Sequence, residues 1–332
     1  MQTSRVIVVG AGVGGLVAAL ALASRGIDVV VVERAGEPGG KLRQVRVGDA
    51  WMDAGPTVFT MRWVFDELLR ECGMQLDDHL KLTAVDVLAR HAWPDGSRLD
   101  LFADVRRSAA AIGELCGLAE MKGYQRFCER AAHIYDTLDR PFLRGTRPSP
   151  FSLVTRVGLR GLGGLARISP FETLWRELGT HFKDPRLRQL FGRYATYCGS
   201  SPYLATATLM LVAHVEQQGV WQVEGGLCSV ATMLAGLARR AGARIRCHAH
   251  VAELVVRNGR VTGVRLADGE QIDGDAVVFN GDAGALAAGL LGAETAAAQR
   301  VKAAPARSLS ASRTPVTRPF LTTSSATWAW QR

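Results

Sequence analysis

The stretch VIVVGAGVGGL, residues 6–16, decides the fold. Residues 6–9 form a β-branched run that predicts a buried strand, and residues 16–24 have the Ala/Leu composition of a helix. The glycines between them, Gly10, Gly12, Gly14 and Gly15, include a GxGxxG pattern. We expect Gly10 to form the turn, Gly12 to let amides approach a phosphate, and Gly15 to allow close helix–strand packing. The sequence therefore predicts a strand–turn–helix unit that binds a phosphate at the positive end of the helix.

The residues that follow supply the context that a lone glycine pattern lacks. Gly26 is expected to end the helix, and residues 29–32 predict a second buried strand. That strand ends at Glu33, close to the ~20-residue offset of the carboxylate that binds a ribose hydroxyl. An acidic residue there argues against a ligand with a 2′-phosphate. An ordinary glycine turn is the alternative, and the strands on both sides of the motif argue against it.

Residues 5–24 also imitate a secretion signal with its cleavage site. The glycines inside the stretch argue against that interpretation, as does the strand after it, which would lose its parallel partner.

Three further motifs indicate which dinucleotide is bound. Glu33-Arg34 is followed by GGKLR at residues 39–43 and by DAGPT at residues 53–57. Together they resemble the FAD-dependent amine oxidase and phytoene desaturase superfamily. Adjacent glycines let amides face an anion, a basic side chain adds charge, and a proline stiffens a loop that lies against a planar ring. The alternative is an ordinary glycine turn before a strand.

The resemblance implies FAD as the cofactor and assigns its contacts. Glu33 would contact the adenosine ribose, the glycine pair and the basic residue after it would follow the pyrophosphate, and the loop at residues 53–57 would approach the flavin ring. Val251 would offer its backbone to the adenine. The expected cofactor-binding residues are Gly10, Gly12, Gly14, Gly15, Glu33, Arg34, Gly39, Gly40, Lys41, Arg43, Gly55, Pro56, Thr57 and Val251.

The pattern along the chain predicts an α/β protein: a Rossmann-like FAD-binding domain with a β-meander, and a largely helical substrate domain inserted in it. We expect the FAD-binding domain at residues 1–85 and 216–310, and the substrate domain at 86–215. In the second part we expect a helix at 229–241, strands at 244–256 and 276–279, and hairpin turns at Asn258-Gly259 and Asp268-Gly269. Residues 311–332 contain no acidic residue and no strand–helix order, which indicates a frameshifted, truncated or disordered tail.

A narrower resemblance covers residues 51–69, 91–93, 182–202 and 219–226, which look like the carotenoid desaturases of purple photosynthetic bacteria. It implies an acyclic carotenoid substrate with a 1-hydroxy or 1-methoxy end, into which a 3,4 double bond is introduced. Such a reaction needs orientation and a dry apolar tunnel more than acid–base groups, and the sequence identifies no catalytic residue. Apolar residues at 194–214 are expected to line the tunnel or to form a plain core. The alternatives are a phytoene or neurosporene desaturase, another amine oxidase-like enzyme, or an inactive fragment.

The net charge of +9 suggests nucleic acid or an anionic membrane as a partner. Residues 140–193 mix arginines with leucines and aromatics, which favours a membrane surface over nucleic acid, and no nucleic-acid motif accompanies them. A cap over the substrate domain with a solvated basic face is an equal alternative. The sequence contains no convincing membrane span. We therefore expect a cytoplasmic protein associated peripherally with the inner, photosynthetic membrane.

The cysteines and histidines predict neither disulfides nor a metal site. The six cysteines are far apart and show no CxxC spacing, which is typical of reduced thiols in the cytoplasm. His248 and His250 would share one face of the strand at 244–256, but no third ligand is spaced to complete a site. The oligomeric state stays open, a homo-oligomer included.

Overall fold

A computed structural model of the chain describes residues 4–139, 143–144 and 172–292. Its centre is a four-stranded, wholly parallel sheet in the order β10-β2-β1-β14. The strands are β1 (Arg5–Val9), β2 (Asp28–Val32), β10 (Arg244–Arg246) and β14 (Ala276–Phe279). The two strands nearest the N-terminus therefore pair with strands more than 200 residues away, which confirms an FAD-type α/β fold interrupted by other structure.

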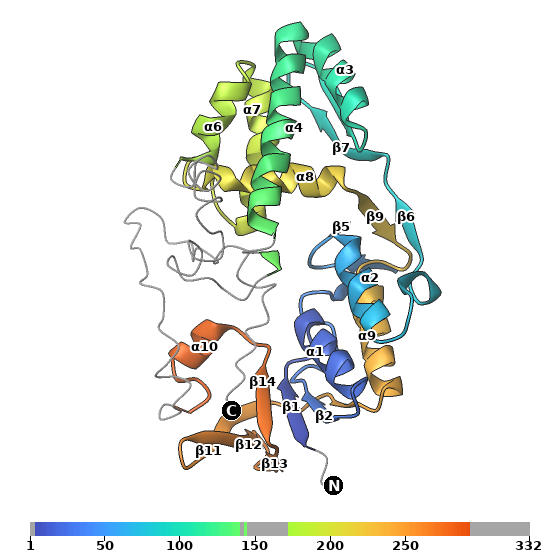
Figure 1. The fold of residues 1–332 in the computed structure, drawn as a ribbon, viewed down its shortest axis with the longest axis vertical. Coiled ribbons are helices and arrows are strands. Elements are labelled where there is room, and N and C mark those ends of the chain that lie inside the picture. The colour runs from blue at the N-terminus through green and yellow to red at the C-terminus, as the bar shows by residue number, and fades with distance from the viewer. Residues whose placement is uncertain (1–3, 140–142, 145–171, 293–332) are drawn as a thin grey trace.

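Both faces of this sheet are covered (Figure 1). Helices α1 (Val13–Ala23) and α9 (Cys228–Arg240) pack on one face, against Val6, Val8, Val29 and Val31. The alternate residues, such as Ile7 and Val30, pack on the other face against the meander. A sheet covered on both sides needs apolar residues at every position, which is why β1 and β2 are continuous β-branched runs.

The meander consists of β11 (Val251–Arg257), β12 (Arg260–Leu266) and β13 (Gln271–Asp273), paired antiparallel in that order. Both predicted hairpin turns are present, with φ of 51° at Asn258 and 73° at Gly259 in the first. The single strand expected at residues 244–256 is wrong. His248 adopts a left-handed φ of 56°, so the chain leaves the parallel sheet after β10 and enters the meander at β11. His248 and His250 lie in that connection and do not share a strand face.

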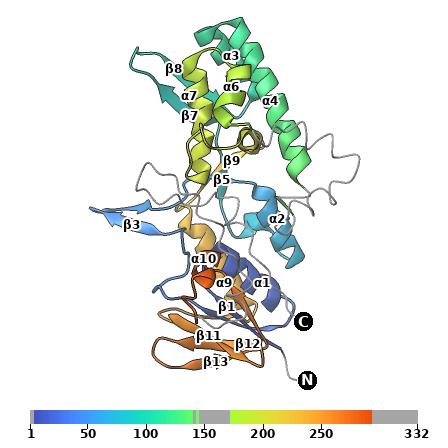
Figure 2. The same ribbon diagram turned by 90° about the vertical axis from the view of Figure 1, so that its left-hand side faces the viewer.

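Short antiparallel elements join this domain to the helical lobe. The sheet β5-β9-β6 brings together β5 (Phe59–Thr60), β9 (Val220–Val223) and β6 (Leu82–Ala84). Helix α2 (Arg62–Glu71) and the 3-10 turn η1 (Leu76–Asp78) follow β5. The hairpin of β3 (Gln44–Val47) and β4 (Ala50–Asp53) projects from the body of the molecule (Figure 2).

The helical lobe begins with a β-hairpin, β7 (Val87–Ala92) and β8 (Arg98–Phe102), which the sequence reading missed. Its helices and 3-10 turns are α3 (Val105–Cys116), α4 (Leu118–Leu138), α6 (Leu174–His181), α7 (Pro185–Gly192), η3 (Arg193–Cys198), η4 (Ala207–Met210) and α8 (Leu211–Gln217). Aromatic rings fill its core, and Phe127 and Phe191 lie 4.6 Å apart between ring centroids. The short element α10 (Ala283–Ala287) follows β14. Most of the basic segment at 140–193, and the whole tail at 311–332, lie outside the described residues.

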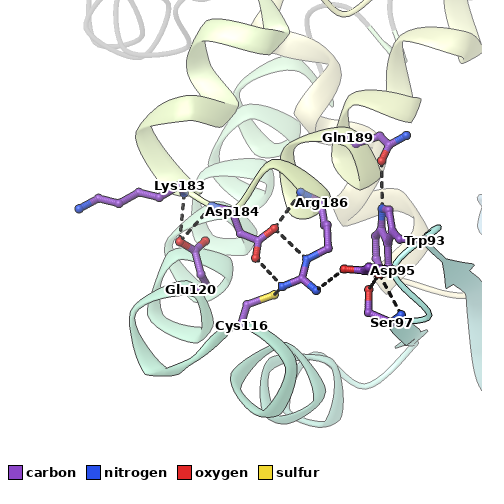
Figure 3. Close-up of polar contacts among 9 residues, drawn as sticks. All are labelled: Trp93, Asp95, Ser97, Cys116, Glu120, Lys183, Asp184, Arg186 and Gln189. Carbon is purple, nitrogen blue, oxygen red and sulfur yellow. Dashed lines mark hydrogen bonds and ion pairs between the residues drawn. The ribbon is translucent and has the colours of Figure 1, made fainter.

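A polar cluster ties the hairpin β7–β8 to the helices around it (Figure 3). Arg186 donates to Asp184 at 2.8 Å, lies 3.5 Å from Asp95 and contacts the Cys116 thiol. The Glu120 carboxylate accepts from the backbone amide of Asp184 at 3.3 Å. The hydrogen bond from Arg186 lowers the pKa of Asp184 to about 2, so this contact stabilises the fold above the ordinary pKa of 3.8 and is lost as the pH falls towards 2. The contacts of this polar cluster hold the hairpin against the helices, which is a structural role.

Candidate functional site

The glycine turn between β1 and α1 has the geometry that phosphate binding requires. Gly10 has a φ of +97°, and its amide donates to the Val32 carbonyl at 2.8 Å. A Cβ placed on Gly15 would overlap the Gly10 carbonyl oxygen, so the helix lies too close to the turn for any side chain there. Helix α1 has no acidic residue in its first turn, which leaves its positive end free of competing charge.

The GGKLR segment lies directly against this turn. The Gly39 amide donates to the Ala11 carbonyl at 2.8 Å, and Gly12 and Gly39 form a parallel bridge. A Cβ on Gly40 would lie 3.0 Å from the Gly12 Cα. Two glycine segments nearly 30 residues apart therefore meet backbone to backbone, in a place that only glycines leave open.

Glu33 follows β2 and is almost fully buried beside the same turn. Its Oε2 accepts from the Ala11 amide at 2.7 Å, and its Oε1 accepts from the Ala35 amide at 2.9 Å. A carboxylate oxygen has about two acceptor positions, so each oxygen still has one for a hydroxyl. The two amides leave the Glu33 carboxylate little freedom to rotate.

The DAGPT loop is held from the opposite side by the start of α9. The Asp53 Oδ2 accepts from the Leu227 amide at 2.8 Å, and a Cβ on Gly226 would lie 2.8 Å from Oδ1. The Oδ1 atom is buried and has no hydrogen-bond partner. A Cβ on Gly55 would overlap the Lys41 carbonyl oxygen, so this loop also touches the GGKLR segment. The three motifs, separate in sequence, therefore form one continuous surface.

The basic and remaining predicted residues border that surface. Arg34, Lys41 and Arg43 are exposed, where they can attract a pyrophosphate. Pro56 is half-buried and Thr57 is exposed, on the loop that leads into β5. The Val251 side chain is buried in the core under the meander, and the amide of nearby Ala249 donates to the Glu33 carbonyl at 2.8 Å. The chain around Val251 thus runs past the end of β2, next to Glu33.

Two parts of the site were not among the predicted cofactor-binding residues: the glycine pair at 225–226, and Asn280. Gly225 and Gly226, both at positive φ, hold Asp53 and Gln44, whose Nε2 donates to the Gly225 carbonyl at 3.2 Å. Their signal was visible, because residues 219–226 resembled the carotenoid desaturases. Asn280 lies against the glycine turn, and nothing in the sequence pattern marked it.

The apolar residues at 194–214 form a packed core, as the second of the two sequence interpretations held. Tyr194, Leu209 and Met210 are buried in the aromatic cluster of the helical lobe. A cavity of about 390 Å³ lies closer to the junction with the FAD-type domain, between Trp63, Tyr135 and Trp221. Within residues 4–139, 143–144 and 172–292, no three side chains are grouped as metal ligands, and no helix is long and apolar enough to cross a bilayer.

We expect replacement of Glu33 with Gln to weaken FAD binding by about ten-fold or more. The variant would lose one acceptor and would place an NH₂ group against the Ala11 or Ala35 amide. Each of these amides now donates to a charged carboxylate, and such a hydrogen bond is worth about 1.5–3 kcal/mol. Isothermal titration with FAD and with FMN tests this. FMN lacks the adenosine ribose, so an equal loss for both ligands would contradict the role of Glu33.

Comparison with known proteins gives consistent results. The family model described as flavin containing amine oxidoreductase matches residues 13–331. Hydroxyneurosporene desaturase of Rubrivivax gelatinosus is 54% identical over 94% of this chain and 59% of its own length. The enzyme of that name from Cereibacter sphaeroides is 45% identical over 87% of this chain and 58% of its own length. The chain thus spans less than two thirds of the length of these relatives.

Solved structures with a similar fold support the same architecture. An oxidoreductase from Methanosarcina mazei superposes with a TM-score of 0.60 at 17% identity, covering 87% of this chain and 61% of the other. Putrescine oxidase bound to putrescine gives a TM-score of 0.57, also at 17% identity, covering 86% of this chain and 59% of the other. At such identities these two matches establish the architecture alone.

Proposed function

The chain belongs to the flavin containing amine oxidoreductase family, and on that basis we propose that it functions as an FAD-dependent carotenoid desaturase. The proposed reaction introduces a 3,4 double bond into an acyclic carotenoid with a 1-hydroxy or 1-methoxy end group. The proposal rests chiefly on one observation, the 54% identity to a hydroxyneurosporene desaturase over 94% of this chain. A 4,4′-diapolycopene oxygenase of Methylomonas sp. is 30% identical to this chain. This identity is lower than that of the hydroxyneurosporene desaturase, so the comparison favours desaturation over oxygenation.

The cofactor of the family is FAD, and the residues present fit it. Glycines occupy the places where a Cβ would collide with neighbouring backbone, and Glu33 keeps two acceptor positions beside them. We assign Gly10, Gly12, Gly15, Gly39 and Gly40 to the pyrophosphate. Arg34, Lys41 and Arg43 supply positive charge to it, and the chain at Val251 lies towards the adenine.

Desaturation of an unactivated hydrocarbon chain asks little of protein side chains. Bound FAD supplies the acceptor for the hydride equivalent that leaves the carotenoid. The chain orients that ring through the loop from Gly55 to Thr57, which the Asp53–Leu227 hydrogen bond holds in place. The helical lobe, which we assign to the substrate, excludes water through its aromatic core.

The decisive experiment incubates the purified chain, supplied with FAD, with 1-hydroxyneurosporene and with phytoene in separate reactions. We expect a longer-wavelength absorbing product from the hydroxylated carotenoid. A red shift with phytoene alone would overturn the proposed substrate. Failure to take up FAD would favour an inactive fragment, and the protein would then lack the yellow absorbance of a flavoprotein.

We also propose that the chain lies on the cytoplasmic face of an anionic inner membrane. The net charge of +9 supports this, as does the projecting hairpin β3–β4. Its side chains Val45, Val47, Trp51 and Met52 are more than 40% exposed, and Arg46 lies among them. Such a combination suits a lipid interface, where apolar groups enter and cations meet headgroups.

Vesicle flotation tests this surface. We expect the variant with Val47→Ser and Trp51→Ser to bind anionic vesicles about a hundred-fold more weakly, because each of the two buried apolar side chains contributes about 1.5–3 kcal/mol. A matched variant with Leu118→Ser and Leu204→Ser, two exposed leucines of the helical lobe, should bind like the original chain. Equal losses in both variants would exclude the hairpin as the lipid contact.

A further inference from the structure

We propose that Asn280 is a positioning residue for the cofactor's pyrophosphate, a role that rests on the FAD binding proposed above. Asn280 directly follows β14, and its backbone amide donates to the Val9 carbonyl at 2.8 Å. This places it at the carboxyl ends of two adjacent parallel strands, the edge at which ligands bind in such sheets. It lies 270 residues from the glycine turn in sequence and next to it in space.

The Asn280 carboxamide fills the space that the turn's glycines leave on the side of β14. Its Nδ2 donates to the Gly10 carbonyl at 3.4 Å. The same Nδ2 would lie 3.0 Å from a Cβ on Gly15 and 3.3 Å from a Cβ on Gly12. Its Oδ1 would lie 2.7 Å from a Cβ on Gly14. A single side chain thus borders the turn at every one of its glycines.

The glycine at position 14 is explained by Asn280 and not by the GxGxxG pattern. It occupies an x position of the GxGxxG pattern, so neither the turn nor the phosphate requires glycine there. A Cβ at position 14 would lie 2.7 Å from the Asn280 oxygen, so a side chain there would displace the carboxamide from the turn. The glycine at 14 and the asparagine at 280 therefore form a matched pair.

The chemistry of the carboxamide suits an anion beside it. The amide group carries two hydrogens, one of which is directed at the Gly10 carbonyl. The second can donate to a phosphate oxygen, and the neutral group adds no charge that would repel one. A carboxylate in the same place would face both the Gly10 carbonyl and the phosphate with oxygens alone.

Titration of the full chain with ADP and with adenosine tests the proposal, because both ligands need only this half of the site and only ADP carries a pyrophosphate. We expect Asn280→Ala to weaken ADP binding about ten-fold, in keeping with the loss of one hydrogen bond to a charged group. Asn280→Asp should weaken it further, because a carboxylate also repels the phosphate. Adenosine binding should not change. Asn258→Asp, the same exchange in a distant hairpin turn, is the control and should leave both affinities intact.

A double-mutant cycle separates this role from simple support of the turn. Gly14→Ala should weaken ADP binding as Asn280→Ala does, and should cost little more when added to Asn280→Ala. Thermal melting without ligand shows that each variant is folded. Unchanged ADP affinity in Asn280→Asp, or equal losses for ADP and adenosine, would overturn the proposal. An original chain that binds neither FAD nor ADP would instead overturn the proposed cofactor, a distinct result.

Discussion

Replacing Gly15 with Ala should destabilise the chain by about 2 kcal/mol and abolish FAD binding, although alanine is the better helix former. Gly15 is in the first turn of α1, where the exchange gains about 1 kcal/mol of helix propensity. The new Cβ would overlap the Gly10 carbonyl oxygen, a backbone atom held by the pairing of β1 with β2 and β14. Overpacking against fixed backbone costs about 1–3 kcal/mol or more, so the steric effect outweighs the propensity. Urea unfolding and FAD titration measure the two effects.

Gly236 in α9 provides the matched control. It is also a helical glycine, but a Cβ added there meets nothing within 4 Å. Gly236→Ala should therefore stabilise the chain by about 0.5–1 kcal/mol and leave FAD affinity unchanged. If Gly15→Ala were as stable as Gly236→Ala, the close approach of α1 to the turn could not be the reason for glycine at position 15.

The glycine turn was predictable because its requirements are local. Residues 6–33 contain the strand, the turn, the helix and the acidic residue in one run, and each signals its structure within a few positions. The hairpin turns of the meander were predictable for the same reason, since Asn258-Gly259 favours left-handed φ wherever it occurs.

Two of the three misses depended on partners distant in sequence. The break at His248 divides the single strand expected at residues 244–256, because β10 is an edge strand of one sheet and β11 must enter another. The hairpin β7–β8 was missed because its two strands are short and precede long helices. The alternation of apolar and polar residues in each strand is too brief to stand out from the helical pattern. Asn280 follows a strand as many asparagines do, and only the fold brings it to Gly14.

Replacing Glu216 with Gln should cost about 3–5 kcal/mol, because it removes the charge at the centre of the helical lobe. Glu216 is 4% exposed. It accepts from both terminal nitrogens of Arg193, at 3.1 and 2.7 Å, and from the hydroxyls of Tyr194 and Tyr197 at 3.1 and 3.0 Å. Burial raises the pKa of both tyrosines, so their hydroxyls remain protonated donors at every pH at which the protein is studied. A carboxamide would leave the half-buried Arg193 without a counter-charge, which is the costly way to break such a pair.

The surface pair Arg265–Glu253 shows how much of that cost comes from burial. Its atoms lie 2.7 Å apart, the same distance as Arg193–Glu216, but both side chains are about 45% exposed. Glu253→Gln should therefore change the free energy of unfolding by at most about 1 kcal/mol. Replacing Arg193 and Glu216 together with Met and Leu should recover only part of the loss. No buried charge then remains unpaired, but the hydroxyls of Tyr194 and Tyr197 lose their acceptor. Urea unfolding of the three variants and the original chain decides the point. A Glu216→Gln protein within 1 kcal/mol of the original would mean that water reaches this carboxylate, and that the lobe is less dry than its proposed apolar substrate requires.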